Sequence, residues 1–381
     1  MPVLRQDPLT GEWVIIATER AKRPETFARP REVEKESLPS RVENCPFCPG
    51  NEHMTPPQVL SYQKENSLYG KASPGNGGSS GNGGQDKQMQ ASGSAATATE
   101  DWSLRVIPNK FPALEATKNQ ESEDSLDVLD ALQRHCNRDF FRSYSGYGVH
   151  EVIIETPDHN RQLADQTEEE IVLLLRSFGE RIRSLEEDPR LRYVQVFRNH
   201  RPEAGASIEH PHCQLIALPY IPPLLDKEYR LAHDYYLDVG QCLLCTLAQE
   251  EEHSGDRVVA LNDHFIAYIP FAAPLPFSTW IVPRQHLSAL EKSPPGMEEQ
   301  LAPIVKDVIG RLDQRLADPP YNFYLHTAPL RSESLPYFHW HLEIIPKLTI
   351  VAGWEMATGT YINVSRPEEA ASYLRDGPGL Y

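Results

Sequence analysis

The sequence predicts an α+β fold of two lobes with the same construction, each an antiparallel sheet with one long helix. Three observations support this prediction. Strand-like segments are followed by two long amphipathic helices, each helix lies between strands, and one set of polar motifs occurs twice. The chain has 381 residues, enough for two domains of ordinary size, which we place at residues 1–222 and 223–381.

The predicted strands and helices follow one another along the chain. Residues 104–107, 148–157 and 193–200 are rich in Val, Ile and aromatic residues, which favours strands. The stretch "QTEEEIVLLLRSFGERIRSLEED" (166–188) carries apolar residues at helical spacing and begins with acidic residues, as suits a helix N-terminus. A second helix of this kind begins at Gly296. Both helices connect strands of what we expect to be an antiparallel sheet.

Composition narrows the classes of function. Residues 71–100 are dominated by Gly, Ser, Asn and Ala and predict a flexible loop. The chain carries 37 Lys and Arg against 54 Asp and Glu, a net charge of −17, which disfavours nucleic acid and anionic membranes as partners. The N-terminus lacks the pattern of a secretory signal, and no apolar run approaches the roughly 18 residues of a membrane span. We therefore expect a soluble, cytoplasmic protein.

Four of the six cysteines form two Cys-x-x-Cys pairs, Cys45 with Cys48 and Cys242 with Cys245. In a chain without a secretory signal, such pairs indicate zinc half-sites or redox dithiols before disulfides. Redox pairs usually open a helix after a strand, whereas Cys45 follows irregular sequence and leads into "PGNE", typical of a knuckle turn. We favour zinc, which requires two more ligands for each pair.

The internal repeat supplies those ligands. In each half, the cysteine pair is followed by a strand ending near a histidine, a long helix, and a strand with histidines at alternate positions. His159 corresponds to His286, and His210 corresponds to His339. His150 competes with His159 as a ligand but has no counterpart in the second half. The predicted zinc ligands of the two sites are Cys45, Cys48, His159 and His210, and Cys242, Cys245, His286 and His339.

The stretch "SIEHPHCQLIALP" (207–219) places His210, His212 and Gln214 at alternate positions of a predicted strand, so they share one face. With His210 bound to zinc, His212 remains free, and a neutral imidazole is a good nucleophile toward phosphorus. The Gln214 amide can donate to a phosphoryl oxygen. Upstream, a small turn offers backbone N–H groups and a hydroxyl as a phosphate cradle, formed by Gly205, Ala206 and Ser207.

Four motifs together resemble the galactose-1-phosphate uridylyltransferase family of the histidine-triad superfamily. They are "ERAKRP" (19–24), "VIPNKFPAL" (106–114), "TPDH" (156–159) and "FRN…GAS…HPHCQ" (197–214). Their order and spacing match over nearly the whole chain, apart from the Gly/Ser insertion. The resemblance implies two histidine-triad-like lobes and a homodimer whose active sites lie at the subunit contact.

The resemblance also implies a reaction, UDP-glucose–hexose-1-phosphate uridylyl transfer by a ping-pong mechanism. His212 would take the nucleotidyl group from a UDP-sugar, and a second hexose 1-phosphate would then accept it. Arg20 and Arg23 would hold the diphosphate, to which the fork of guanidinium donors is suited. Asn109 and Asn199 would contact the nucleotide.

The second half departs from the uridylyltransferase pattern. In well-studied uridylyltransferases this half holds iron with a glutamate and three histidines, whereas the second Cys-x-x-Cys here favours zinc, with Glu228 and His341 as alternative ligands. Tyr361 stands where those enzymes place a sugar-contacting glutamine. These features resemble the ADP-glucose phosphorylase branch, which transfers an adenylyl group to phosphate, while Pro211 in "HPH" favours uridylyl transfer.

A hypothesis of another class is a zinc-stabilised nucleotide-binding protein without turnover. A binding module has no need of a free histidine beside Ser207 and Gln214, so the sequence favours the enzyme. The expected partners are a nucleotide-sugar and a hexose 1-phosphate, with zinc at two sites.

Overall fold

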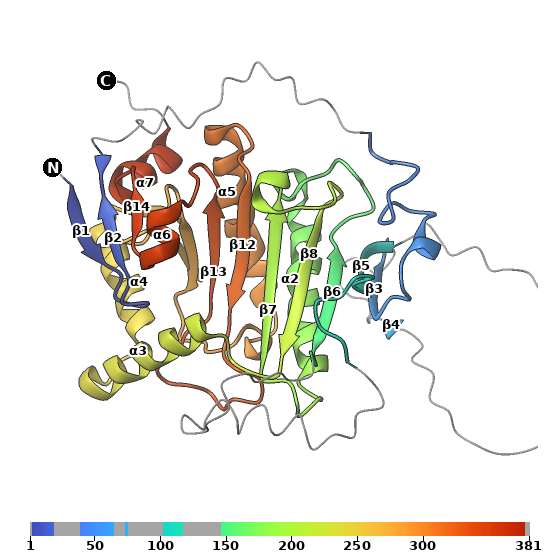
Figure 1. Ribbon diagram of the computed structural model, residues 1–381, viewed down its shortest axis with the longest axis horizontal. Coiled ribbons are helices and arrows are strands. Elements are labelled where there is room, and N and C mark those ends of the chain that lie inside the picture. Colours follow the sequence, from blue (N-terminus) through green and yellow to red (C-terminus); the bar gives the residue numbers. More distant parts are fainter. Residues whose placement is uncertain (1, 19–38, 65–72, 75–101, 117–145, 378–381) are drawn as a thin grey trace, which may run out of the picture.

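The computed structural model describes residues 2–18, 39–64, 73–74, 102–116 and 146–377. Eleven of the described strands form one large sheet (Figure 1). In spatial order they are β4 (Ser73–Pro74), β3 (Leu60–Gln63), β5 (Trp102–Pro108), β6 (Val149–Ile154), β8 (His212–Leu218), β7 (Tyr193–His200), β12 (Tyr321–His326), β13 (His341–Pro346), β11 (Thr279–Pro283), β10 (Phe265–Tyr268) and β9 (Val258–Leu261).

The large sheet is antiparallel throughout and nearly symmetrical about its middle. Strand β7 pairs with β12, with Asn199 opposite Asn322, and this pairing joins the first half of the chain to the second. Moving outward from that seam, β8, β6 and β5 on one side correspond to β13, β11 and β10 on the other. The predicted α+β fold with two similar antiparallel lobes is confirmed.

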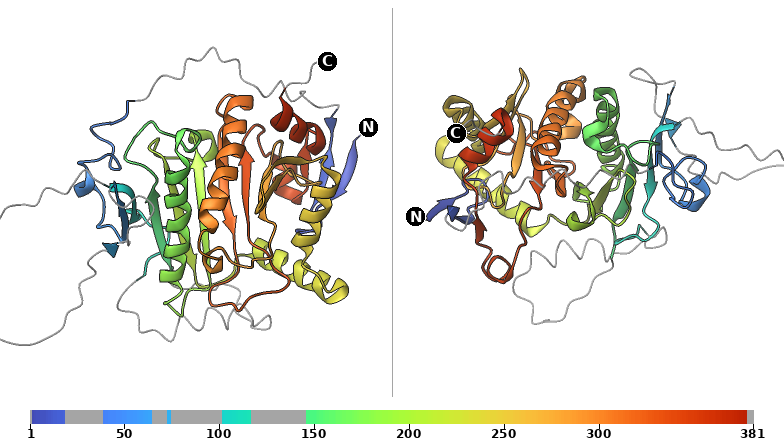
Figure 2. Two further views of the ribbon diagram at one scale, coloured as in Figure 1. Left: turned by 180° about the vertical axis from the view of Figure 1, so that it is seen from behind. Right: turned by 90° about the horizontal axis from the view of Figure 1, so that it is seen from above.

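The helices of the described residues lie around this sheet. Those of the lobes are α2 (Glu168–Leu185) and α5 (Met297–Leu316), and the others are α3 (Pro223–Val239), α4 (Leu243–Ser254), α6 (Gly353–Thr358) and α7 (Pro367–Asp376), with 3₁₀ turns η3 (Glu52–Met54), η5 (Leu163–Asp165), η6 (Pro202–Ala204) and η7 (Leu290–Lys292). Helices α2 and α5 pack side by side across one face of the sheet (Figure 2, left). These are the two helices that the apolar periodicity predicts.

Local sequence explains where α2 begins and which face it buries. Thr167 caps its N-terminus, because the Thr167 side chain accepts from the Glu170 N–H while the Glu170 carboxylate accepts from the Thr167 N–H. Its apolar stripe, including Phe178, packs on the sheet, where the Phe178 ring lies 6.4 Å from that of Phe323 in β12. Each lobe thus buries one face of its strands under one helix.

Successive side chains of β8 point to opposite faces of the sheet, so one set packs in the core and the other faces the candidate site. Cys213, Leu215 and Ala217 belong to the main apolar core beneath the helices. His212 and Gln214 therefore point to the face opposite α2 and α5. The sequence prediction that these two side chains share a face away from Cys213 is confirmed.

The N-terminal strands lie with the C-terminal part of the chain. Strands β1 (Val3–Gln6) and β2 (Trp13–Ile16) are antiparallel, and β14 (Tyr361–Asn363) adds to β2 in parallel. Within the Gly/Ser-rich insertion, Ser73 and Pro74 pair with β3, and the other residues of 71–100 lie outside the described residues. None of the helices in the described ranges combines the length and the apolar character needed to cross a bilayer.

Candidate active site

The first predicted metal site is assembled as expected. The side chains of Cys45, Cys48, His159 and His210 are all buried, and one ligand atom from each lies within 4.8 Å of the others. Sulfur-to-Nδ1 distances are 3.7 Å for Cys45 to His210 and 3.5 Å for Cys48 to His159. In tetrahedral zinc sites, with Zn–S near 2.3 Å and Zn–N near 2.0 Å, sulfur and nitrogen ligands are about 3.5 Å apart. The four side chains fit zinc.

The surroundings of this group favour the neutral form of the His210 imidazole, which can bind a metal ion through Nδ1. The His210 Nε2 lies 2.8 Å from the Thr156 carbonyl, so Nε2 carries the proton and Nδ1 presents a lone pair to the sulfurs. Burial lowers the pKa of His210 to about 4 and raises that of the Cys45 thiol to about 11. Two buried thiols facing unprotonated ring nitrogens are the donor set that a structural zinc ion requires.

The second predicted metal site is also assembled, in a different setting. The ligand atoms of Cys242, Cys245, His286 and His339 lie within 4.8 Å of one another. The Cys245 sulfur is 3.3 Å from the Nδ1 of His286 and 3.2 Å from that of His339. Cys242 caps helix α4, and both cysteines border an open cavity of about 300 Å³. These side chains fit zinc as well.

The alternative ligands of the second half form a separate group. Glu228 and His341 lie together with His326, their ligand atoms within 4.8 Å of one another. His326 Nδ1 is 3.0 Å from the Glu228 carboxylate, and His341 Nε2 is 3.2 Å from that of Glu343. Burial lowers the pKa of His326, but the carboxylates of Glu228 and Glu343 outweigh it and raise the pKa to about 9. A protonated His326 would balance part of the carboxylate charge in this cluster.

The predicted nucleophile, His212, opens strand β8 two residues after the predicted zinc ligand His210. Its Nδ1 lies 2.8 Å from the His210 carbonyl, so Nδ1 donates and Nε2 keeps its lone pair. The side chain is 8% exposed, and burial lowers its pKa, which favours the neutral ring. The Phe47 ring packs edge-on against it at 5.4 Å. His212 is thus a fixed, neutral imidazole with one nitrogen free to react.

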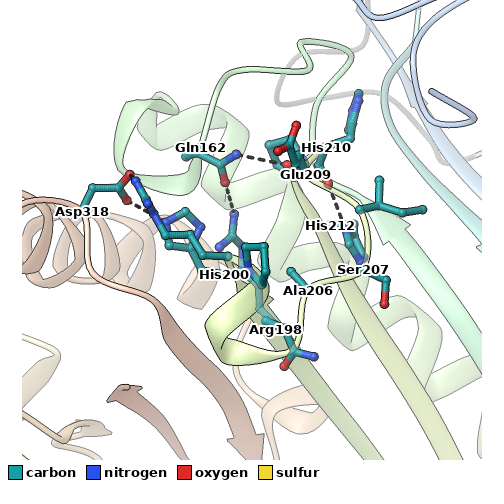
Figure 3. A pocket seen from close by; sticks show the side chains of 14 residues that line it. Gln162, Arg198, His200, Ala206, Ser207, Glu209, His210, His212 and Asp318 are labelled. Carbon is teal, nitrogen blue, oxygen red and sulfur yellow. Dashed lines mark hydrogen bonds and ion pairs between the residues drawn. The ribbon is translucent and has the colours of Figure 1, made fainter. Parts of the chain in front are cut away.

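His212 lines a cavity of about 490 Å³ (Figure 3). Asn199, Ala206 and Ser207 line the same cavity. Gly205 has a left-handed φ of 94°, and a Cβ there would meet the Asn199 amide at 3.4 Å, so the turn is built for glycine. The Asn199 amide donates to the Gly205 carbonyl at 3.4 Å. Ala206 and Ser207 of the predicted phosphate cradle therefore line one pocket with the predicted nucleophile. The Gly205 and Ala206 N–H groups, however, donate within the turn, to the Pro202 and Arg201 carbonyls.

Other predicted nucleotide contacts lie elsewhere. Gln214 and Asn109 meet at the His150 ring, whose Nε2 is 2.9 Å from Gln214 Oε1 and 3.1 Å from Asn109 Nδ2. His150, considered as a rival zinc ligand, is thus engaged with these two side chains instead of the cysteines. Arg20 and Arg23 lie outside the described residues.

The cavity also includes residues that the sequence analysis missed. Asp318, from the loop after α5, accepts from His200 Nε2 at 2.7 Å and pairs with Arg201. Arg201, Ala317 and Asp318 all have φ between 55° and 71°, although none is glycine. The second half of the chain therefore contributes one wall of the pocket. No sequence motif around Asp318 predicted this contribution.

A buried ion pair supports the strands beneath the nucleophile. The Arg198 Nε donates to Glu155 Oε1 at 2.7 Å, and both side chains are almost wholly buried. The Cys213 thiol donates to the same carboxylate at 3.2 Å. Arg198 also donates to Gln162 at 3.0 Å, and both residues line the pocket. Removing one partner of such a pair leaves a buried charge uncompensated, so we expect the pair to hold β7 against the end of β6.

Comparison with known proteins agrees with this geometry. Residues 1–68 and 90–222 match the galactose-1-phosphate uridyl transferase N-terminal domain, and residues 227–376 match the C-terminal domain. ADP-glucose phosphorylase of Arabidopsis thaliana is 33% identical over 98% of this chain and 93% of its own. Galactose-1-phosphate uridylyltransferase of Thermotoga maritima is 27% identical over 99% of this chain and 98% of its own.

A solved structure of a similar protein supports the same family assignment. The crystal structure of an ADP-glucose phosphorylase from Arabidopsis thaliana with bound ADP-glucose superposes with a TM-score of 0.74 at 32% identity, covering all of both chains. The resemblance found in the sequence motifs is confirmed, and so is the predicted class of enzyme. The chain belongs to the galactose-1-phosphate uridyl transferase family and is a nucleotidyltransferase.

Proposed function

We propose that this enzyme transfers a nucleotidyl group from a nucleotide-sugar through a covalent intermediate on His212. The observation that carries the proposal is the hydrogen bond from His212 Nδ1 to the His210 carbonyl, which leaves the Nε2 lone pair available in a pocket that also holds the turn at 205–207. The Nε2 attacks the α-phosphorus, the bond from phosphorus to the sugar phosphate oxygen breaks, and the sugar 1-phosphate leaves. A second phosphate then attacks the same phosphorus and releases the histidine.

The other predicted site residues have supporting roles in this scheme. The Ser207 N–H and hydroxyl bind phosphate oxygens, because the N–H groups of Gly205 and Ala206 already donate to the Pro202 and Arg201 carbonyls. Asn199 holds the turn. Gln214 donates its amide N–H to an oxygen of the transferred phosphoryl group. Asn109, Arg20 and Arg23 contact the nucleotide. The leaving group and the acceptor are both phosphates, so one pocket serves both half-reactions and no strong general acid is needed.

Zinc is proposed for both cysteine–histidine groups, on the strength of their distances and donor chemistry. When bound, zinc would compensate the charge of the thiolates and lock four side chains from distant parts of the chain together. In the first group this fixes His210 and so aims His212. The second group ties α4 to the end of β11 and the start of β13.

The favoured reaction is adenylyl transfer from ADP-glucose to phosphate. It is supported by the 33% identity to ADP-glucose phosphorylase, against 27% to the Thermotoga uridylyltransferase. Uridylyl transfer from UDP-glucose to galactose 1-phosphate is the second candidate, because Pro211 gives the "HPH" form that favoured it in the sequence. Both reactions use the same covalent histidine.

We further propose two lobes divided at residues 222 and 223, and a homodimer. The C-terminal segment before β14 leaves large apolar side chains in solvent, with Ile350 92% and Met356 80% exposed and Trp354 also exposed. Clusters of such side chains are a common mark of an interface. A second copy of the chain is the partner that the family resemblance implies.

Intact-protein mass spectrometry tests the mechanism and the nucleotide together. Brief incubation with ADP-glucose should leave an AMP adduct that maps to His212, and UDP-glucose a weaker UMP adduct. His212→Asn should lose the adduct and lower turnover on the order of 10⁴-fold or more, with zinc content unchanged. His264→Asn, in an exposed turn, is the matched control and should behave as wild type. Turnover without any adduct, or binding without turnover, would overturn the proposal.

A further inference from the structure

His150 connects two parts of the site that the mechanism uses separately. It is the second residue of β6 and lies on the same face of the sheet as Gln214, since Val149 and Glu151 lie on the helix side, where Glu151 binds Arg181 of α2. Its Nε2 is 2.9 Å from Gln214 Oε1, and its Nδ1 is 3.1 Å from the Ala113 backbone nitrogen. No metal group among the described residues includes this ring.

The hydrogen-bond partners determine where the imidazole proton lies. The Ala113 backbone N–H can only donate, so the Nδ1 of His150 must accept and carries no proton. The proton of the neutral ring is then on Nε2, where it donates to the Gln214 oxygen. Asn109 Nδ2 also lies 3.1 Å from Nε2, but this is a contact between two donors and not a hydrogen bond. The Asn109 oxygen accepts from the Phe111 N–H at 2.9 Å, so only the amide nitrogen faces the ring. Asn109 offers no acceptor that competes for the proton.

This arrangement decides which way the Gln214 amide points. Oxygen and nitrogen of a carboxamide cannot be told apart by shape, so an unrestrained glutamine would present either one to a phosphate. A carbonyl oxygen facing a phosphoryl oxygen would repel it, whereas the amide N–H would stabilise it. With the oxygen held by His150, the amide nitrogen is the group left to donate.

We propose that His150 is a positioning residue that orients Gln214 for transfer of the nucleotidyl group. The same ring holds the loop that carries Asn109, because the Ala113 N–H donates to its Nδ1 at 3.1 Å. One side chain therefore sets both the β8 residue next to the nucleophile and the loop after β5. The inference rests on the proposed function, in which Gln214 contacts the transferred phosphoryl group.

The test compares His150→Phe, which keeps the ring but cannot donate, with His150→Gln, whose amide nitrogen replaces Nε2–H. Rates of adduct formation at His212 are measured in single turnovers with ADP-glucose and UDP-glucose. His150→Phe should slow this step about 10-fold, the size expected for one lost hydrogen bond, mainly in the rate constant and less in substrate affinity. His150→Gln should recover most of the rate. His264→Phe serves as the matched control.

A double-mutant cycle separates positioning from a structural role. Gln214→Leu alone should slow adduct formation on the order of 100-fold, the effect of losing one donor to a developing charge. Adding His150→Phe to that variant should change the rate less than about 2-fold, because the glutamine it orients is gone. Equal effects of His150→Phe in both backgrounds, or no effect in the wild type, would overturn the inference. Absence of any adduct at His212 in the wild type would instead overturn the proposed function.

Discussion

The two cysteine–histidine groups have the same composition but different surroundings. The first is fully buried, and its cysteines form a knuckle in which the Cys48 N–H donates to the Cys45 carbonyl at 3.2 Å. The second places Cys242 at the start of a helix and leaves Cys245 and His286 only partly buried beside an open cavity. His212, the predicted nucleophile, lies two residues after His210 of the first group. At the corresponding place in the second group, His341 is engaged by the Glu343 carboxylate at 3.2 Å.

The pKa values of the cysteine thiols also differ between the two groups. Burial raises the pKa of Cys45 to about 11. The pKa of Cys242 is lowered instead, first by the hydrogen bond from Cys245 and then by those from His286 and His339. A thiolate at the first group therefore depends on a metal ion, while the second group stabilises one thiolate with its own donors. These differences predict different roles for two groups with the same donor set: aiming the strand of His212 in one lobe and stability in the other.

The largest effect that tests this division is expected for Cys45→Ser. Loss of a ligand should release zinc and free His210, whose neighbour His212 then loses its fixed direction. Misplacement of a reacting atom by about 1 Å costs on the order of 100-fold, so we expect that loss or more in kcat, with a smaller change in KM. Steady-state kinetics and metal analysis provide the measurements. Near wild-type turnover in a zinc-depleted variant would show that the first group does not aim the nucleophile.

Cys242→Ser should lower the thermal stability of the protein more than its turnover, the reverse of what is expected for Cys45→Ser. Loss of the second metal removes a tie between α4 and two strands, so the melting temperature should fall by several degrees or more. Turnover at 25 °C should stay within about 3-fold of wild type, because no residue of this group lines the His212 pocket. Calorimetry alongside activity assays checks both parts. A loss of turnover as large as that of Cys45→Ser would remove the distinction between the lobes.

Chelation should show the same difference without mutation. The intact chain should hold about two zinc ions, one for each closed group. A mild chelator should remove the ion of the partly exposed group first and leave most of the activity, and the ion of the buried group more slowly, together with the activity. Elemental analysis and activity are followed over time. Three metals per chain would place an ion in the cluster of Glu228, His326 and His341, and simultaneous loss of metal and activity would contradict the predicted order.

A smaller effect is expected for Asp7→Asn, in the N-terminal segment whose Leu9 packs with Cys242. Burial raises the pKa of Asp7 to about 6, although the Leu9 and Thr10 N–H groups donate to it. The folded chain therefore binds this proton more tightly than the unfolded chain, so the contribution of Asp7 to stability is lost as pH rises from about 4 to about 6.

Asparagine removes that dependence while keeping the acceptor. Above pH 6 the Asp7→Asn variant should be more stable than wild type by at most about 2–3 kcal/mol, and the gain should vanish near pH 4. Thermal melts across this range measure the difference, and turnover should be unchanged. A gain in stability that is independent of pH would mean that the Asp7 carboxyl is not the titrating group.

Much of the molecule could be predicted from local pattern and repetition. The helices α2 and α5 follow from apolar periodicity, and both metal groups follow from the repeat of Cys-x-x-Cys with two histidines. The sequence did not reveal α3 and α4, although Pro223 at the first position of α3 and Gly240 after its end are ordinary boundary signals.

The contacts that the sequence analysis did not predict are made by strand register and not by a local sequence motif. Asp318 reaches His200 across 118 residues of sequence because β7 pairs with β12, and no local pattern encodes that pairing. His150 was considered only as a rival of His159 for the first metal site. Its contact with Gln214 arises from the alignment of β6 with β8, in which Val152 lies opposite Gln214.

The seam between β7 and β12 has a consequence for how the chain folds. Residues about 120 positions apart must find each other before the middle of the sheet closes, and contacts of such long range slow folding. Until β12 has left the ribosome, β7 has an open edge with unpaired backbone groups, which invites pairing with another chain. Expression of the first half alone should therefore yield aggregates or swapped assemblies, and co-expression of the second half should restore solubility.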